Sequence, residues 1–315
     1  MNNRSLFARF VLIVAIVIPL ASCSAFDRLR ALRVIKDAHT QYQRGDYAAA
    51  SELYEEVLAN DPDLVDAYFY LANSYDQQFR PALRGEPEND QFLDLAIDNY
   101  IKSAEQQTGR PMQTLSMQYL VAAFGPDKAN EPSKSEPVLQ TMINTDPENP
   151  DNYFALSRLY EDSGMVAEAE EVLLDVAANN TDDPGVYLQI AGFYNRNEQF
   201  EETIAALRER AALEPENPEA FYTLATYYWE KAFRDFTLTE DEQLEHVMLG
   251  LVEVDLSLEL NADYMEALTY KNILLRMQAN LTDAGTERDE LIAEADVLRE
   301  RAEELQKLRA SGLGG

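Results

Sequence analysis

Three prolines in the middle of this 315-residue chain recur at one fixed spacing: Pro150, Pro184 and Pro218 stand 34 residues apart, twice in succession. Four further columns keep the same spacing and hold aromatic, aliphatic, small and tyrosine residues in turn. These columns are Tyr153/Tyr187/Phe221, Leu156/Ile190/Leu224, Ser157/Ala191/Ala225 and Tyr160/Tyr194/Tyr228. Such a period indicates stacked units, because a unit of this size cannot bury its apolar face alone.

Each period predicts a helix that begins at its proline. The four columns fall at i, i+3, i+4 and i+7, so they share one helix face. An asparagine or aspartate precedes each proline, as in an N-cap followed by proline at the first helical position; the expected caps are Asn149, Asp183 and Asn217. Small residues in the third column allow a second helix to pack closely, so each unit should form a helical hairpin.

This helix–turn–helix period of 34 residues resembles the tetratricopeptide repeat. The resemblance implies an all-α fold, a tetratricopeptide-repeat solenoid whose helical hairpins form a right-handed superhelix. It also implies that the first helix of each unit lines a concave groove. Weaker copies extend the pattern in both directions, and about seven units are expected over residues 31–285.

The pattern is interrupted at three places. Insertions are expected near residues 80–90 and 234–245, and a degenerate unit is expected near residues 112–147. Residues 286–309 predict a long polar helix that caps the solenoid, and residues 310–315 a tail. The apolar positions of this helix would also suit a short coiled coil between two copies, which is the alternative; they are Leu291, Ala295, Leu298, Ala302 and Leu305.

The chain begins with the features of a secretory signal. Arg4 and Arg9 accompany an uncharged apolar run over residues 10–20, which is too short to span a bilayer. Leu20-Ala21-Ser22-Cys23 follows directly, and Cys23 is the only cysteine in the chain. This segment resembles the bacterial lipobox.

The lipobox resemblance implies a signal peptide over residues 1–22 that is cleaved, and a lipid on Cys23. Residues 23–30 would then form the lipidated N-terminus and a short tether. Two or more acyl chains anchor a protein stably, so we expect the chain in the bacterial cell envelope. Ser24, in place of an aspartate, favours the outer membrane, with the protein facing the periplasm. The alternative is a plain secretory signal in which the cysteine is incidental.

The charge balance and the lack of reactive motifs exclude several functions. Acidic residues number 57 against 26 lysines and arginines, so the net charge is −31. Nucleic acids and anionic membranes both require positive protein surface, so neither is expected to bind the body of the chain. His39 and His246 lie far apart, and no zinc-ligand set is predicted. Because catalytic and phosphate-binding motifs are also missing, we expect no enzyme, no cofactor, no metal and no small-molecule substrate.

The tetratricopeptide resemblance assigns fixed positions of each first helix to the concave groove. In this chain they are Phe69, Asn73, Asp76, Phe154, Arg158, Glu161, Leu188, Asn195, Arg196, Tyr222, Thr226 and Trp229. Aromatic, amide and guanidinium side chains are common in peptide-binding surfaces. For Trp229, the only tryptophan, packing beneath residues 234–245 is the alternative.

Together these features predict a non-enzymatic envelope lipoprotein that acts as a protein–protein interaction scaffold and binds partner proteins or extended peptides in its groove. It looks like the tetratricopeptide lipoproteins that serve β-barrel assembly, pilus-secretin assembly or recruitment of murein hydrolases, and the sequence does not choose among them. One alternative is an adaptor or regulatory subunit for an envelope hydrolase or protease. Another is an enzyme subunit that is inactive without a separate catalytic partner.

Overall fold

The structure is a computed structural model that describes residues 26–107, 109 and 111–311. Within these residues the chain folds into helices and short connecting segments, with no strand, so the predicted all-α class is confirmed. The predicted signal peptide, the lipobox and Cys23 lie outside the described residues.

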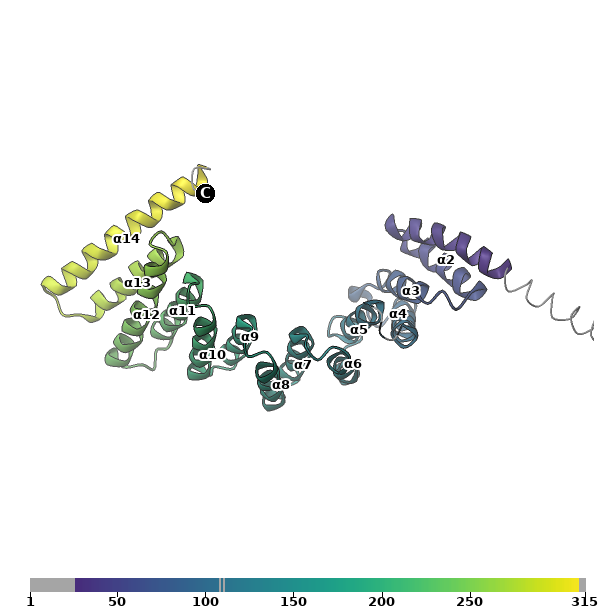
Figure 1. Ribbon diagram of the computed structural model, residues 1–315, viewed down its shortest axis with the longest axis horizontal. Coiled ribbons are helices and arrows are strands. Elements are labelled where there is room, and N and C mark those ends of the chain that lie inside the picture. The colour runs from purple at the N-terminus through teal and green to yellow at the C-terminus, as the bar shows by residue number, and fades with distance from the viewer. Residues whose placement is uncertain (1–25, 108, 110, 312–315) are drawn as a thin grey trace, which may run out of the picture. The chain divides into compact units, whose positions relative to one another are not determined.

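The helices follow one another as a series of hairpins. A helix over residues 26–43 comes first. It is followed by α2 (Tyr47–Asn60), α3 (Asp66–Asp76), the short η1 (Pro81–Leu83), α4 (Pro87–Gln106), α5 (Pro111–Phe124), α6 (Pro132–Thr145), α7 (Pro150–Asp162), α8 (Val166–Asn179), α9 (Pro184–Arg196), α10 (Phe200–Leu213), α11 (Pro218–Arg234), α12 (Glu240–Leu260), α13 (Met265–Leu281) and α14 (Thr286–Ala310). Helix α12 packs on both α11 and α13, and α13 packs on α14, so these four helices lie side by side in Figure 1.

The chain divides into two compact units between Val172 and Leu173, within α8. Unit 1 extends from the first helix to the first half of α8, and unit 2 from the second half of α8 to α14. Each unit has its own apolar core. In unit 1 the core includes the fully buried Tyr54 and Tyr100. In unit 2 it includes Val247 of α12 and other apolar residues of α11, α13 and α14.

The predicted helix starts are confirmed. Helices α7, α9 and α11 each begin at a proline, and the preceding side chain accepts a hydrogen bond from the backbone N–H two residues later. The three distances are 3.1 Å for Asn149, 2.8 Å for Asp183 and 3.0 Å for Asn217. The aliphatic and small columns are buried throughout. The first aromatic column is buried at Tyr153 and half-buried at Tyr187 and Phe221.

Residues 234–245, expected as an insertion, mostly lengthen the two helices beside them. Helix α11 has 17 residues and α12 has 21, against 13 in α9 and 14 in α10. The connection is only residues 235–239, and Thr239 ends it with a capping box to Glu242. Packing stays close after the longer turn, because a methyl group at Gly250 would lie 3.3 Å from Cβ of Tyr228 on α11.

Two N-terminal segments also contain more helix than expected. Helix α4 begins at Pro87, inside the expected insertion over residues 80–90, and η1 occupies part of the remainder. The first helix begins by residue 26, inside the segment expected as a tether. No glycine or proline occurs between Ser24 and Arg44. The sequence therefore contains no helix-breaking residue that would delay the start of the helix to residue 31.

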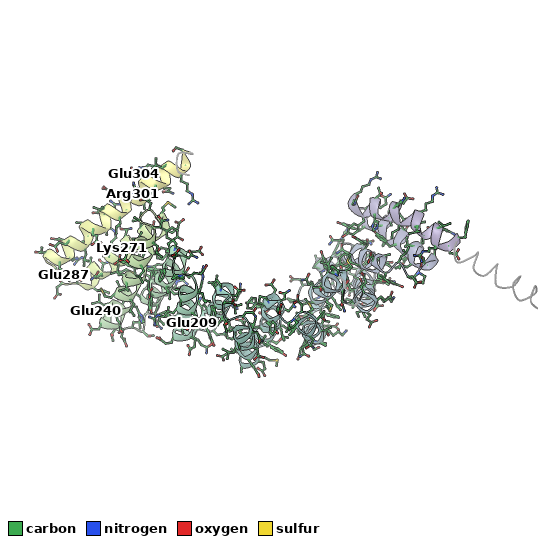
Figure 2. The ribbon with its side chains drawn as sticks, viewed as in Figure 1. Glu209, Glu240, Lys271, Glu287, Arg301 and Glu304 are labelled. Atoms are coloured by element: carbon green, nitrogen blue, oxygen red, sulfur yellow. The ribbon has the colours of Figure 1, made fainter. Side chains whose placement is uncertain are left out.

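Helix α14 is the second helix of the last hairpin, and it packs on α13. Ala295 and Ala302 are buried there, and Leu291 and Leu298 pack against the core of unit 2. The apolar positions of α14 therefore serve the predicted capping helix. Ion pairs to acidic residues support the contact, and Figure 2 labels two of the cations that form them, Lys271 of α13 and Arg301 of α14. Lys271 Nζ lies 3.1 Å from Glu294 Oε1 on α14.

Candidate functional site

Partly exposed aromatic rings gather on the first helices of the last two hairpins of unit 2. Tyr222, Trp229 and Phe233 project from α11, while Tyr264 and Tyr270 lie at the N-cap and in the second turn of α13. We call these five residues the aromatic surface. Four of them are half-buried, and Phe233 is 56% exposed. The surface exists because α11 and α13 are in direct contact.

The rings hold one another in defined orientations. Trp229 stacks on Phe233, with ring centroids 5.3 Å apart and planes 10° from parallel. Tyr270 meets the Trp229 ring edge to face at 5.4 Å, and it meets Tyr222 in the same manner at 5.3 Å. Tyr222 also packs edge to face on Tyr264 at 5.5 Å. Such pairs are favourable beyond their apolar burial, so the surface is preorganised rather than loose.

Two acidic side chains, Glu219 and Glu266, lie near the tyrosines of this surface. Burial raises the pKa of the Tyr222 hydroxyl to about 12, and the nearby Tyr270, Tyr264 and Glu266 add to the rise. The pKa of Tyr264 is also raised, first by burial and then by Glu266 and Glu219. Both tyrosines are therefore neutral hydrogen-bonding groups at physiological pH. The negative charge beside the rings favours cationic or neutral ligands over anionic ones.

The indole of Trp229 keeps one polar atom without a protein partner. Among the side chains that the structure describes, its Nε1 is shielded from solvent and makes no hydrogen bond. The indole ring contacts Phe233 and Tyr270. The alternative prediction is that the ring packs beneath residues 234–245. Within residues 234–245, only residues 235–239 form the connecting segment, and residues 240–245 belong to α12.

The neighbouring first helix, α9, carries three predicted residues of the same unit. Leu188, Asn195 and Arg196 are all exposed. Arg196 lies close enough to Tyr227 of α11 to oppose the rise that burial causes in the pKa of that tyrosine. Thr226, also predicted, is half-buried, and its hydroxyl donates to the backbone carbonyl of Thr223 at 2.7 Å. These positions extend the accessible face of unit 2 from α11 towards α9.

In unit 1, helix α7 carries three further predicted residues. Phe154 and Glu161 are half-buried, and Arg158 is exposed. Arg158 forms ion pairs along its own helix, at 3.1 Å to Asp162 and 3.5 Å to Glu161. A partner could compete for this guanidinium group, because exposed pairs of this kind contribute little to stability.

The three predicted residues on α3 do not face an open surface, and for them the expectation is wrong. Phe69, Asn73 and Asp76 are only 4%, 3% and 6% exposed. Asn73 accepts a hydrogen bond from the Tyr42 hydroxyl at 2.8 Å and donates one to the Tyr100 hydroxyl at 3.1 Å. Its amide is therefore used inside the fold.

A connecting segment accounts for much of this burial. Between α5 and α6, residues 125–131 approach α3, and Lys128 forms an ion pair with Asp76 across 52 positions of sequence. Arg84 fixes the same segment by donating to the backbone carbonyls of Pro126 and Lys128 at 2.9 and 3.2 Å. Phe69 is covered separately, by the rings of Tyr70, Tyr100 and Tyr119 at centroid distances of 5.5, 5.9 and 5.5 Å.

Comparison with known proteins identifies the repeat. Sequence models of the tetratricopeptide repeat match residues 36–98 and 128–189. The solved C-terminal part of a TPR repeat-containing protein from Cytophaga hutchinsonii matches 85% of this chain and 93% of its own, with a TM-score of 0.54 and 14% identity. The chain carries tetratricopeptide repeats. Proteins with this repeat generally act as protein-interaction scaffolds, and these matches indicate no enzyme family.

Two other solved structures are similar at lower scores. A tetratricopeptide repeat protein from Parabacteroides merdae matches 84% of this chain and 98% of its own, with 12% identity and a TM-score of 0.43. YrrB, described as a TPR protein with an unusual peptide-binding site, matches 61% of this chain and 91% of its own, with 16% identity and a TM-score of 0.40. No curated protein sequence matches the chain.

Phe233, Tyr264 and Tyr270 belong to the aromatic surface but were not predicted. The 34-residue spacing fails after Tyr228, because α11 and α12 are longer than in the preceding tetratricopeptide repeat. The position that should follow Tyr222 therefore could not be located on α13. One signal was available for Phe233, which stands four residues after Trp229 and so shares its helix face.

Other kinds of site find no support in residues 26–311, so far as the structure describes them. No cluster of three or more histidine, cysteine, aspartate or glutamate side chains there could hold a metal ion. None of the described helices is both long enough and apolar enough to cross a membrane. In unit 1, a cavity of about 480 Å³ lies between α4, α5 and α6, and none of the predicted groove residues lines it.

Proposed function

We propose that this protein is a lipid-anchored lipoprotein of the bacterial cell envelope that binds partner proteins or extended peptides on the first-helix face of its repeats. The tetratricopeptide repeats support a scaffold, and Leu20-Ala21-Ser22-Cys23 supports the anchor. Ser24 favours the outer membrane, with the repeats in the periplasm.

The aromatic surface of unit 2 carries the binding part of this proposal. Interface hot spots are enriched in tryptophan and tyrosine, because a rigid ring buries much area at little entropic cost. Three rings of this surface hold one another in place and remain half-exposed, namely Tyr222, Trp229 and Tyr270. The neighbouring first helix supplies polar groups from Asn195 and Arg196. Among the described residues of unit 2, no other group of half-exposed rings combines mutual ring packing with polar side chains on a neighbouring first helix.

Site-specific photocrosslinking in the living cell tests the binding surface. A benzophenone amino acid replaces Tyr222, and a matched control carries it at Val297, an exposed position on α14. We expect one discrete adduct from position 222 that is absent from position 297, and loss of that adduct when Trp229→Ala is added. The same adduct from both positions, or from position 297 alone, would place binding elsewhere.

Metabolic labelling tests the anchor separately. Palmitate carrying an alkyne should enter the wild-type chain and should not enter Cys23→Ser, because only a thiol can form the thioether. Ser22→Ala is the matched control, since it keeps a small residue before the cysteine. Equal labelling of Cys23→Ser and wild type would refute the anchor and leave the binding surface untouched.

A further inference from the structure

The first helix, residues 26–43, exposes large apolar side chains at its beginning. Phe26 is 71% exposed, Leu29 67% and Leu32 41%. A helix at the end of a repeat array has no neighbour on its outer side, so that side is normally polar. Here it is not, and among the described residues nothing packs over these apolar side chains.

The exposed apolar residues share a face with two cations. An α-helix advances about 100° per residue, which brings Arg33 and Lys36 into the same sector as Phe26, Leu29 and Leu32. Both cations are exposed, and neither makes an ion pair with the described residues. The opposite face packs inward, where Ala31 and Ala38 are fully buried in the core of unit 1.

Two other cations of this helix fix it to the next one. Arg30 lies 2.7 Å from Glu56 of α2, and Arg28 lies 3.8 Å from Asp61 at the end of α2. These contacts leave the apolar residues and the free cations on the outside. Positive charge gathered in one short segment is unusual in a chain whose net charge is −31.

Helix α14, at the other end of the array, shows the contrast. Its large exposed apolar residues are Val297 and Leu308, which stand eleven positions apart. Arginines on it are paired with acids of the same helix, as at Arg299–Asp296 (3.2 Å) and Arg301–Glu304 (2.6 Å). The C-terminal end therefore presents an ordinary solvated face, and the N-terminal end does not.

We propose that the outer face of residues 26–36 docks on an anionic phospholipid surface. Phe26, Leu29 and Leu32 enter the boundary between headgroups and acyl chains, and Arg33 and Lys36 bind lipid phosphates. The segment is about 15 Å long and follows Cys23 after two residues. This docking proposal rests on the proposed lipid anchor, which would hold the segment at the membrane. The acidic remainder of the chain is repelled, so the docked helix orients the repeats away from the surface.

Insertion can be measured with a single tryptophan. In the full chain, Phe26→Trp combined with Trp229→Phe places the only tryptophan at the proposed depth. The protein is reconstituted into vesicles of phosphatidylglycerol and phosphatidylcholine, with bromine atoms on the upper part of the acyl chains. We expect the emission of the introduced indole to be quenched by at least half and shifted to the blue, relative to vesicles without bromine.

Two controls separate docking from anchoring. Val297→Trp with Trp229→Phe should associate with the same vesicles and show no quenching. Arg33→Gln/Lys36→Gln, added to the Phe26→Trp chain, should reduce quenching in anionic vesicles to the level seen with phosphatidylcholine alone. Vesicle association of the Phe26→Trp chain without quenching of its indole would overturn the docking proposal and leave the anchor standing. A chain that fails to associate with the vesicles would overturn both.

Discussion

Helices α3 and α11 occupy the same place in their hairpins, yet they use their predicted binding positions in opposite ways. On α3, Phe69 is buried against the rings of Tyr100 and Tyr119, and Asn73 is buried with hydrogen bonds to the hydroxyls of Tyr42 and Tyr100. On α11, Tyr222 and Trp229 remain half-exposed, and the indole N–H has no protein partner among the described residues. Equal positions in a repeat therefore do not have equal functions.

The difference comes from what covers each helix. A tyrosine-rich layer and residues 125–131 enclose α3, whereas the corresponding connection after α13 is short and leaves α11 accessible. A repeat sequence fixes which side chains point to the first-helix face. Segments outside the repeat decide whether that face is core or surface.

Truncating a ring should have its largest effect in unit 1. Phe69→Ala should lower the free energy of unfolding by about 3–5 kcal/mol, because it leaves a cavity among three aromatic rings. Phe233→Ala is the matched change in unit 2 and should cost about 1 kcal/mol or less, since Phe233 is largely exposed. Urea unfolding followed by circular dichroism measures both. Similar losses of unfolding free energy for the two variants would contradict the difference in burial between α3 and α11.

Removing the cation that covers α3 should have the next largest effect. Lys128→Ala leaves the buried carboxylate of Asp76 with only the Tyr100 hydroxyl, at 3.4 Å, and should cost about 2–3 kcal/mol. Arg30→Ala removes a solvent-exposed ion pair from the same unit and should cost less than about 1 kcal/mol. Thermal unfolding of the two variants compares them. A loss for Lys128→Ala no larger than that for Arg30→Ala would mean that residues 125–131 do not close the face.

Acidification should lower the free energy of unfolding of both units, because each unit contains one partly buried histidine. Burial lowers the pKa of His39, against the opposing charge of Asp66, and burial followed by Lys231 lowers the pKa of His246. The folded chain then binds fewer protons than the unfolded chain near the ordinary value of 6.5. Their contribution to stability is therefore complete above pH 6.5 and is lost as the pH falls from that value through the lowered pKa of each folded-state histidine.

Nuclear magnetic resonance of the imidazole Cε1–H groups tests this directly. Both titration midpoints should lie below 6.5, the ordinary histidine value. His39→Phe and His246→Phe assign the two signals and should each flatten part of the loss of stability on acidification. A midpoint at or above the ordinary value for either residue would show that burial does not dominate its pKa in the folded chain.

The sequence predicted the parts of the fold that depend on local pattern. The proline spacing located the starts of α7, α9 and α11 and their caps, and the apolar positions of α14 predicted the capping helix. It did not predict the burial of Asp76, because its partner Lys128 lies 52 positions away in a segment without repeat character. It missed Tyr264 and Tyr270 because the longer α11 and α12 shift the spacing. Long-range contacts and changes in helix length carry no periodic signal.

Hydrogen–deuterium exchange, with and without the partner captured at position 222, tests the central claim most directly. The account predicts slower exchange in α11 and α13 on binding and no change in α3, whose first-helix face is already closed. Protection of α3, with α11 and α13 unchanged, would contradict it.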